Sequence, residues 1–245
     1  MRGPVNFWMR RLVDGARRQV WPPMCIACGG MGDAASGRDL CAACHRALPW
    51  NARACRRCAL PLPATDAGGT CGACLAVACP LDRVTAAFAY AAPLDRLLPM
   101  FKFHQSMAAG RLLSGLMAEG LRDAAMPDGD AVLVPIPLHR GRLRQRGYDQ
   151  ALELARPLAR QLGLPLAADV LVRPKPTGAQ SRLDKAGRRA NLAGAFQVRQ
   201  GRSLPAHVIL LDDVMTTGAT LEAAASALRQ AGVRRVEAWV CARVA

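Results

Sequence analysis

This 245-residue sequence has few aromatic and few acidic residues, and it contains no long apolar run. Only 4% of its residues are aromatic, so we expect a core built mainly of Ala, Leu and Val. No run approaches the ~18 apolar residues that a membrane-spanning helix needs. We therefore expect no stable membrane insertion.

The N-terminal segment, residues 1–24, also lacks the features of a secretion signal. It is basic, but it has no apolar stretch of ~7–15 residues and no small-residue cleavage site. Phe7, Trp8, Leu12 and Val20 are spaced to share one face of a short amphipathic helix. Docking of this helix on the core is favoured over anchoring at a membrane surface, and we expect a cytoplasmic protein.

The scarcity of acids leaves a net charge of +15, from 33 Lys or Arg against 18 Asp or Glu. Much of the excess falls in residues 131–210. A basic field attracts nucleotides, nucleic acid or a phosphorylated sugar, although an Arg-rich surface can also reflect composition alone. Because aromatic residues are scarce, we expect any nucleic acid to be contacted through its backbone more than by base stacking.

Cysteine is the residue with the clearest pattern. Eight of the ten cysteines form four C-x-x-C pairs, and twelve residues separate the first pair from the second and the third from the fourth. The pattern C-x2-C-x12-C-x2-C thus occurs twice, which indicates a repeated structural unit. Its members are Cys25, Cys28, Cys41, Cys44, Cys55, Cys58, Cys71 and Cys74.

Two C-x-x-C pairs supply four thiolates for a closed tetrahedral zinc site, and a closed site is structural. Since residues 25–79 are poor in large apolar side chains, metal binding would supply the missing folding energy. A disulfide framework needs an oxidising compartment, and a redox dithiol needs only one pair. We therefore predict two structural zinc ions. One ion per repeat is the simplest pairing, and an interleaved pairing stays open.

After residue 80 strands and helices alternate. Strands are expected at 84–90, 131–138, 170–172, 195–198, 208–211 and 236–242, and helices at 93–103, 106–125, 147–162 and 219–231. Pro157 is expected to kink or split the third helix. The alternation predicts an α/β fold, a parallel sheet flanked by helices, preceded by a small Cys-rich zinc-binding region.

The segment 208–220 reads V-I-L-L-D-D-V-M-T-T-G-A-T. A buried strand leads into Asp212 and Asp213, and a hydroxyl-rich turn with Gly218 precedes a helix. Free backbone N–H groups at a helix start form a cradle for a phosphate. Paired carboxylates suit the vicinal hydroxyls of a sugar. Together they predict a site for a ribose 5-phosphate at the carboxyl end of the strand.

This segment resembles the phosphoribosyl pyrophosphate (PRPP) signature of type I phosphoribosyltransferases. With the cysteine repeat in front of it, the chain is similar from Cys25 onward to the ComF family of competence-type proteins. The resemblance implies a double zinc ribbon at 25–79, a phosphoribosyltransferase-like domain at 80–245, and Mg²⁺ bound together with PRPP. The PRPP-binding residues it implies are Asp212, Asp213, Met215, Thr216, Thr217, Gly218, Ala219 and Thr220.

Three further segments are similar to family segments. L-L-P-M-F-K-F at 97–103 resembles the lysine segment, and 134–150 resembles the R-G-F-N-Q segment, with Tyr148 and Asp149 in place of Phe and Asn. The cationic segment 173–191 reads as a loop that closes over pyrophosphate, or as a surface linker. The candidate cations at the pyrophosphate end and in this loop are Lys102, Arg146, Arg173, Lys175, Arg182 and Arg188.

Two functions follow as expectations. The first is an Mg²⁺-dependent, phosphoribosyltransferase-like protein that binds PRPP and is linked to nucleotide salvage or DNA uptake. The second is a non-catalytic factor that binds single-stranded DNA on the same fold and works with competence or DNA-handling proteins. A purely structural scaffold leaves the Asp pair and its turn unexplained. No residue stands out as a nucleophile, and His104 and His139 fall in expected loops near the site.

Overall fold

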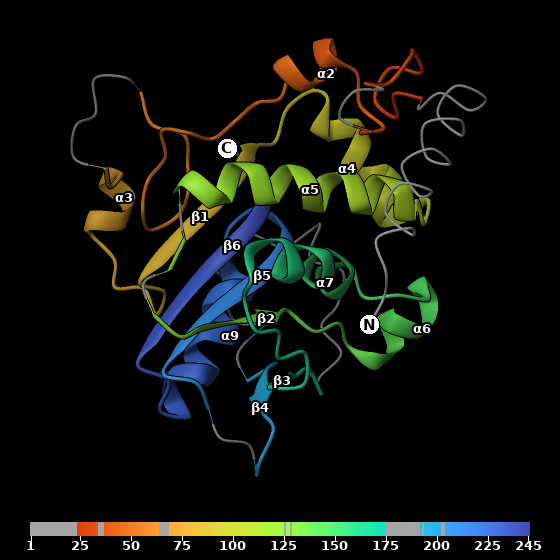
Figure 1. Cartoon of the computed structure of the whole chain (residues 1–245). Helices are drawn as coiled ribbons and strands as arrows, with labels where there is room; N and C mark the ends of the chain where they lie inside the picture. Colours follow the sequence, from red (N-terminus) through yellow and green to blue (C-terminus); the bar gives the residue numbers. More distant parts are fainter. Residues whose placement is uncertain are drawn as a thin grey trace, which may run out of the picture.

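A four-stranded parallel sheet forms the centre of the molecule, with helices on both of its faces (Figure 1). The computed structural model describes residues 24–245 except 34–36, 64–68, 125, 128, 175–191, 193 and 202–203. No helix in this described part is long and apolar enough to cross a membrane. The elements are α2 (Ala42–Arg46), α3 (Gly72–Leu75), β1 (Arg83–Ala89), α4 (Leu94–Phe103), α5 (Met107–Ala124), β2 (Ala131–Pro135), α6 (Arg140–Arg146), α7 (Gln150–Leu162), β3 (Leu171–Val172), β4 (Gln197–Val198), β5 (His207–Met215), α9 (Ala219–Gln230) and β6 (Arg235–Arg243).

The strand order is β1-β6-β5-β2, which confirms the predicted parallel sheet. Side chains alternate between its two faces because successive residues of a strand point in opposite directions. Ile209 and Leu211 of β5 pack into the core beneath α4, α5 and α7. Val208 and Leu210 pack into the second core, beneath α9. Both faces are therefore covered, as the alternation of strands and helices predicted.

Three predicted elements differ from the structure. Strand β5 runs to Met215, four residues beyond its predicted end, so the two aspartates lie in the strand. The predicted helix 147–162 begins at Gln150 and continues through Pro157, while Arg140–Arg146 forms a separate helix. The short strands β3 and β4 pair with each other in antiparallel fashion and do not join the main sheet.

The segment that links the two cysteine repeats, together with the start of the second repeat, covers the free edge of β1. Trp50 forms an antiparallel bridge with Phe88, and the N–H of Ala89 donates to the carbonyl of Pro49 at 2.9 Å. The N–H of Val84 donates to the carbonyl of Arg56 at 2.8 Å. An uncovered edge strand can pair with another chain, so this segment protects the sheet from association.

The contact between Trp50 and α5 gives a stability prediction. A Cβ at Gly120 would lie 2.8 Å from Cζ3 of Trp50, whereas a Cβ at Gly115, on the same helix, would meet nothing within 4 Å. We expect Gly120→Ala to lower the free energy of unfolding by about 1–3 kcal/mol because of overpacking. Gly115→Ala is the matched control and should raise it by up to about 1 kcal/mol, since alanine favours the helix. Urea denaturation measures the free energy of unfolding of both variants, and equal values would contradict the close packing of Trp50 on Gly120.

Candidate functional site

The eight repeated cysteines form two clusters, one within each repeat. Cys25, Cys28, Cys41 and Cys44 make the first cluster, and Cys55, Cys58, Cys71 and Cys74 make the second. In each cluster the sulfur atoms all lie within 4.8 Å of one another. All ten cysteines are free of disulfides. The structure thus selects the sequential pairing over the interleaved one and excludes a disulfide framework.

The sulfur spacing fits zinc. A tetrahedron with Zn–S bonds of about 2.3 Å has edges of about 3.8 Å. The sulfur atoms of Cys28 and Cys41 are 3.9 Å apart, and those of Cys58 and Cys71 are 3.7 Å apart. With four cysteine ligands no position stays open for a substrate, so the two clusters are consistent with two structural zinc sites.

The thiols of the first cluster have opposed proton affinities. Burial favours the neutral Cys25, but hydrogen bonds from the backbone N–H groups of Cys41 and Cys28 outweigh burial and lower its pKa to about 6. Burial, followed by the thiols of Cys41, Cys28 and Cys25, raises the pKa of Cys44 to about 12. Four close thiolates repel one another unless a cation lies among them, which is the environment that zinc requires.

A second candidate site lies at the carboxyl ends of β2 and β5. It is a cavity of about 220 Å³ lined by acids from β5 and by cations from three other segments. In an open parallel sheet this edge is where ligands bind, because the loops that leave the strands diverge there. The polar lining residues are Lys102, Arg142, Arg146, Asp149, Gln150, Arg173, Asp212, Asp213, Thr216 and Thr220.

Asp212 and Asp213 lie near the carboxyl end of β5, and their side chains point to opposite faces of the sheet. The N–H of Asp213 donates to Oδ1 of Asp212 at 2.8 Å, and the N–H of Val214 donates to Oδ1 of Asp213 at 2.7 Å. Burial, followed by the charge of Asp213, raises the pKa of Asp212 to about 7. A carboxylate held in this costly state is typical of a binding site, because a ligand can compensate its charge.

Lys102 supplies the nearest compensating charge. Its Nζ lies 2.7 Å from Oδ2 of Asp213, whose side chain is almost fully buried. Lys102 belongs to the last turn of α4, and α4 is held to the segment between α6 and α7 by the hydroxyl of Tyr148, which donates to the carbonyl of Phe101. The rings of Phe101 and Tyr148 pack 5.6 Å apart. The lysine segment and the 134–150 segment, distant in sequence, thus meet at the cavity.

Asp149 has a local structural role at this edge. Its Oδ1 accepts from the N–H of Leu152 at 3.1 Å and caps α7, and its Oδ2 accepts from the N–H of Leu138 at 3.0 Å. Burial raises its pKa, although these backbone donors act in the opposite direction. Two carboxylate oxygens meet both donors, whereas an asparagine has only one acceptor oxygen. Asp149 therefore fixes where α7 begins and how β2 leaves the sheet.

Three arginines complete the cationic lining. Arg142 and Arg146 come from α6, and Arg173 follows β3. Burial lowers the pKa of Arg173, and the charge of Arg142 lowers it further, while Asp212 raises it. The guanidinium of Arg173 lies 5.1 Å from the centroid of the Phe196 ring. Arg142 was not among the predicted site residues. Residues 140–146 belonged to no predicted element, because four arginines at alternate positions gave no helical apolar face.

The turn after β5 is narrow. Gly218 has φ +82°, a left-handed conformation that other residues adopt at a cost, and it caps α9 (Ala219–Gln230). Thr216 is exposed and Thr217 partly exposed, whereas Gly218 and Ala219 are buried. Thr216 and Thr220 line the cavity, whereas Met215 and Thr217 face the second cysteine cluster. Among the predicted cations, Lys175, Arg182 and Arg188 lie outside the described residues.

The turn gives a second stability prediction. A Cβ at Gly218 would lie 2.5 Å from Cε of the buried Met215, and the φ of +82° adds strain. We expect Gly218→Ala to lower the free energy of unfolding by about 2–4 kcal/mol. Gly232→Ala is the matched control, because Gly232 has φ +95° but nothing within 4 Å of its Cβ position. It should cost only about 1–2 kcal/mol. Denaturant titration that ranks the two in the reverse order would contradict the close contact.

Comparison with known proteins covers both candidate sites. Residues 16–75 match the model of the double zinc ribbon domain, and residues 149–245 match that of the phosphoribosyl transferase domain. The first match contains both cysteine clusters, and the second contains the Asp pair and its turn.

Relatives match much of the chain. It is 33% identical over 181 residues to Competence protein F of Haemophilus influenzae, across 71% of this chain and 78% of that protein. It is 32% identical over 231 residues to DNA utilization protein YhgH of Salmonella typhimurium, across 91% and 97%. Competence protein ComFC of Bacillus subtilis is 39% identical over 106 residues, across 43% and 41%. The chain therefore belongs to the ComF family, with an N-terminal double zinc ribbon and a phosphoribosyltransferase domain.

Proposed function

We propose that the cavity at the carboxyl ends of β2 and β5 binds PRPP with Mg²⁺ and that the protein transfers the phosphoribosyl group. One observation carries the proposal: Asp212 and Asp213 and the turn that follows them border a cavity otherwise rich in cations. Acids and cations so close together suit a ligand that presents hydroxyls at one end and phosphates at the other.

Each part of PRPP has a matching part of the cavity. The carboxylates of Asp212 and Asp213 accept hydrogen bonds from the 2′ and 3′ hydroxyls. The backbone N–H groups at the start of α9, with the hydroxyls of Thr216 and Thr220, receive the 5′-phosphate. The pyrophosphate faces the cations, which are Lys102, Arg142, Arg146 and Arg173.

Displacement at C1 of the ribose follows from this arrangement. The bond from C1 to the pyrophosphate oxygen breaks with its electron pair leaving on pyrophosphate, and the bond to the nucleophile forms. Negative charge thus grows where the arginines and Lys102 lie, and positive charge grows on the sugar near the two carboxylates, so catalysis is mainly electrostatic. Mg²⁺, when bound, would neutralise further charge on the pyrophosphate, and the carboxylates of Asp212 and Asp213 would be the residues that hold it.

Thermal unfolding tests the proposal. PRPP at 100 times its Kd should stabilise the folded protein by about 2.7 kcal/mol, visible as a rise in Tm. The rise should be largest with Mg²⁺ present, smaller with ribose 5-phosphate or pyrophosphate alone, and absent with a neutral sugar. If millimolar PRPP with Mg²⁺ leaves Tm unchanged, the proposal is wrong. Release of pyrophosphate in the presence of a nucleobase then tests transfer itself.

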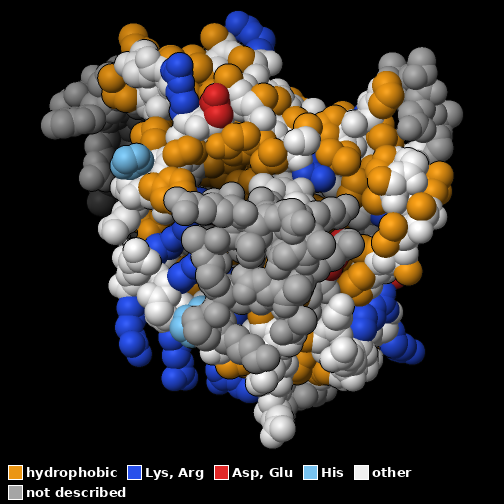
Figure 2. All heavy atoms as spheres, turned by 180° about the vertical axis from the view of Figure 1, so that it is seen from behind, with side chains coloured by type: hydrophobic (Ala, Val, Ile, Leu, Met, Phe, Trp, Pro, Cys, Tyr) orange, Lys and Arg blue, Asp and Glu red, His pale blue; other side chains and the backbone are white. Residues whose placement is uncertain are grey.

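A specific observation favours a second function, binding of single-stranded DNA. Helix α6 carries Arg140, Arg142, Arg144 and Arg146 beside the cavity, and the guanidinium of Arg146 lies 5.7 Å from the ring centroid of Phe103, which is 65% exposed. On the face drawn in Figure 2, blue Lys and Arg side chains are prominent and red acidic ones are sparse. Several relatives are named DNA utilization proteins.

Salt dependence tests this second function. Backbone contact by several arginines releases counterions, so affinity for an oligonucleotide should fall steeply between low and physiological salt. Arg140→Gln with Arg144→Gln should reduce the slope, since both side chains are exposed and neither lines the cavity. Fluorescence anisotropy measures the binding. If the affinity does not change with salt concentration, contact with the phosphate backbone of the DNA is excluded as the basis of binding.

A further inference from the structure

The second cysteine cluster is tied to the turn after β5 by one buried arginine. Arg243, the last residue of β6, is only 7% exposed. Its Nε donates to the carbonyl oxygen of Cys58 at 2.8 Å, and its Nη1 donates to the carbonyl oxygen of Met215 at 3.3 Å. A single guanidinium therefore spans a cysteine of the second cluster and the residue at which the turn begins.

The Met215 carbonyl is a sensitive point for the turn. Met215 pairs with Arg243 in the β5–β6 register, and its carbonyl also accepts from the N–H of Val244 at 3.0 Å. Its side chain lies under Gly218, where a Cβ would come within 2.5 Å of Cε. Because the packing is this close, a shift at Met215 must be passed on to Gly218 and to the N–H groups after it.

The contact between ribbon and turn is broader than the arginine alone. A cavity of about 110 Å³ lies between them, with Cys58, Cys71 and Cys74 on one side. Thr217 and Glu222 line its other side. The second ribbon thus faces the turn at Met215 and Thr217.

The first ribbon supports a different part of the molecule. Its Arg38 and His45 contact the two carboxylate oxygens of Glu119 on α5, at 2.8 and 3.0 Å. Its buried residues Cys25, Leu40 and Leu48 belong to the core beneath α4, α5 and α7. In the described part of the chain, the contacts of this ribbon lead to α5, and Gly37, Arg38 and Asp39 line a cavity with that helix.

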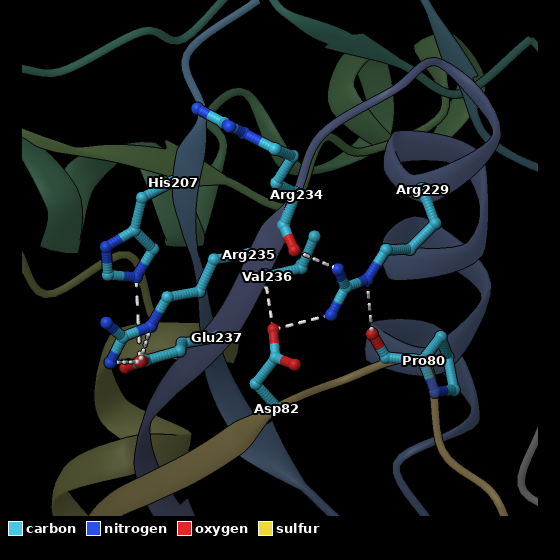
Figure 3. Close-up of polar contacts among 8 residues, drawn as sticks. All are labelled: Pro80, Asp82, His207, Arg229, Arg234, Arg235, Val236 and Glu237. Carbon is cyan, nitrogen blue, oxygen red and sulfur yellow. Dashed lines mark hydrogen bonds and ion pairs between the residues drawn. The ribbon is translucent and has the colours of Figure 1, made fainter.

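The opposite ends of the same strands have their own polar contacts, shown in Figure 3. Oδ2 of Asp82 accepts from the N–H of Val236 at 2.8 Å and from Nη2 of Arg229 at 2.5 Å. Glu237, which is buried, lies 2.6 Å from Nη2 of Arg235 and 3.6 Å from Nε2 of His207. The amino ends of β5 and β6 are therefore fixed without either cysteine cluster, and only their carboxyl ends depend on the second ribbon.

We infer that Arg243 is a positioning residue through which zinc in the second cluster holds the turn 215–220 in its ligand-binding form. Without that zinc the knuckle at 55–60 loses the ion that defines it, and the Cys58 carbonyl no longer offers a fixed acceptor. A buried guanidinium that loses an acceptor is unfavourable, so Arg243 moves to find a new acceptor, and its hydrogen bond to the Met215 carbonyl is displaced with it. The two zinc sites are thus unequal: the second controls the turn, and the first controls only stability. The inference concerns affinity for PRPP and rests to that extent on the proposed function.

Matched cysteine variants of the full chain test the inequality. Cys74→Ser and Cys44→Ser remove the last cysteine of the second and first clusters, and each should lower the zinc content from two to one per chain. Hydrogen exchange of the ligand-free protein should then accelerate in 215–220 for Cys74→Ser alone. The Kd for PRPP with Mg²⁺ should rise about tenfold for Cys74→Ser and less than about twofold for Cys44→Ser.

Arg243→Met tests the link without touching a cysteine. It should keep two zinc ions per chain, accelerate exchange in 215–220 and raise the Kd about tenfold, which is the loss of about one charged hydrogen bond. Arg229→Met, at the opposite end of the sheet, is its control and should lower Tm without either effect. Equal effects of the two cysteine variants, or normal exchange in Arg243→Met, would overturn the inference. Hydrogen exchange needs no ligand, so absent PRPP binding by the wild type would refute the proposed function alone.

Discussion

Replacing Asp212 by asparagine is expected to stabilise the ligand-free protein at pH 8 and to weaken PRPP binding by about 100-fold. Burial and Asp213 raise the pKa of Asp212 to about 7, so at pH 8 the folded protein holds an unfavourable charge that asparagine removes. Asparagine keeps the acceptor for the N–H of Asp213, which donates to Oδ1 at 2.8 Å. We expect a rise in Tm of about 3–6 °C, together with loss of the hydrogen bonds to the sugar hydroxyls.

The pH dependence of this gain has a definite sign. An unfolded aspartate has a pKa near 3.9, whereas Asp212 in the folded protein titrates at about 7. Between these values the folded state holds a proton that the unfolded state has lost, so wild-type stability falls as pH rises. The Tm difference between variant and wild type should therefore be small near pH 4, grow up to about pH 7 and stay constant above it.

Asp95→Asn is the matched control for charge. Asp95 is exposed in the first turn of α4, where a negative charge is mildly stabilising, so its loss should lower Tm slightly and leave PRPP binding unchanged. Calorimetry across pH with isothermal titration of PRPP measures both quantities. If Asp212→Asn is destabilised at pH 8, the raised pKa of Asp212 is contradicted. If it binds PRPP as tightly as the wild type does, Asp212 does not bind the sugar hydroxyls.

The end of β5 illustrates what the sequence could and could not predict. The four apolar residues before Asp212 predicted the buried strand and its place beside the site correctly. The strand was predicted to end at Leu211 because the apolar run ends there and two acids follow. Backbone pairing does not depend on side-chain polarity, and the ladder with β6 continues to Met215 opposite Arg243. Partner strands are distant in sequence, so local patterns miss such an extension.

Helix α7 shows that the proline in its sequence was given too much weight and its boundary residues too little. Pro157 suggested a kink, yet the helix continues from Gln150 to Leu162. Pro157 is partly exposed, so the carbonyl it leaves without a partner can be hydrated. The real break precedes the helix, where Gly147 ends α6 at φ +80° and Asp149 caps α7. Glycine after a helix and aspartate before one are the usual boundary residues, and reading them would have found both helices.

The cysteine clusters were predictable because metal ligands impose a local spacing. Two residues between paired cysteines and a repeated gap of twelve were enough to predict four thiols around each zinc ion. What each ribbon contacts was not predictable, since those contacts join segments far apart in sequence. Arg38 to Glu119 and Arg243 to Cys58 are separated by 81 and 185 residues. Nothing near either arginine in the sequence indicates its partner.

Removal of both zinc ions from the full chain is expected to lower Tm by more than about 10 °C and to cause aggregation on heating. Structural zinc contributes folding free energy directly, and these knuckles are part of the main cores. Cys25 is 1% exposed and Cys55 is fully buried, and Ala59 of the second knuckle packs in the core beneath α9. Loss of zinc therefore loosens the core and not only the ribbons.

Aggregation follows from the position of the ribbons in the sheet. Strand β1 is an edge strand, and it is covered by Pro49 and Trp50 of the chain between the ribbons and by Arg56 of the second ribbon. When the ribbons lose their metal, this cover is no longer fixed at its two ends, and β1 becomes more available to a second molecule. Chelation followed by calorimetry and light scattering measures both effects. Cys241→Ala is the control: Cys241 is fully buried outside the clusters, so its variant should keep two zinc ions and stay monodisperse. If the chelated protein has the same Tm as the native one, the fold does not depend on zinc, and the sheet edge is protected without it.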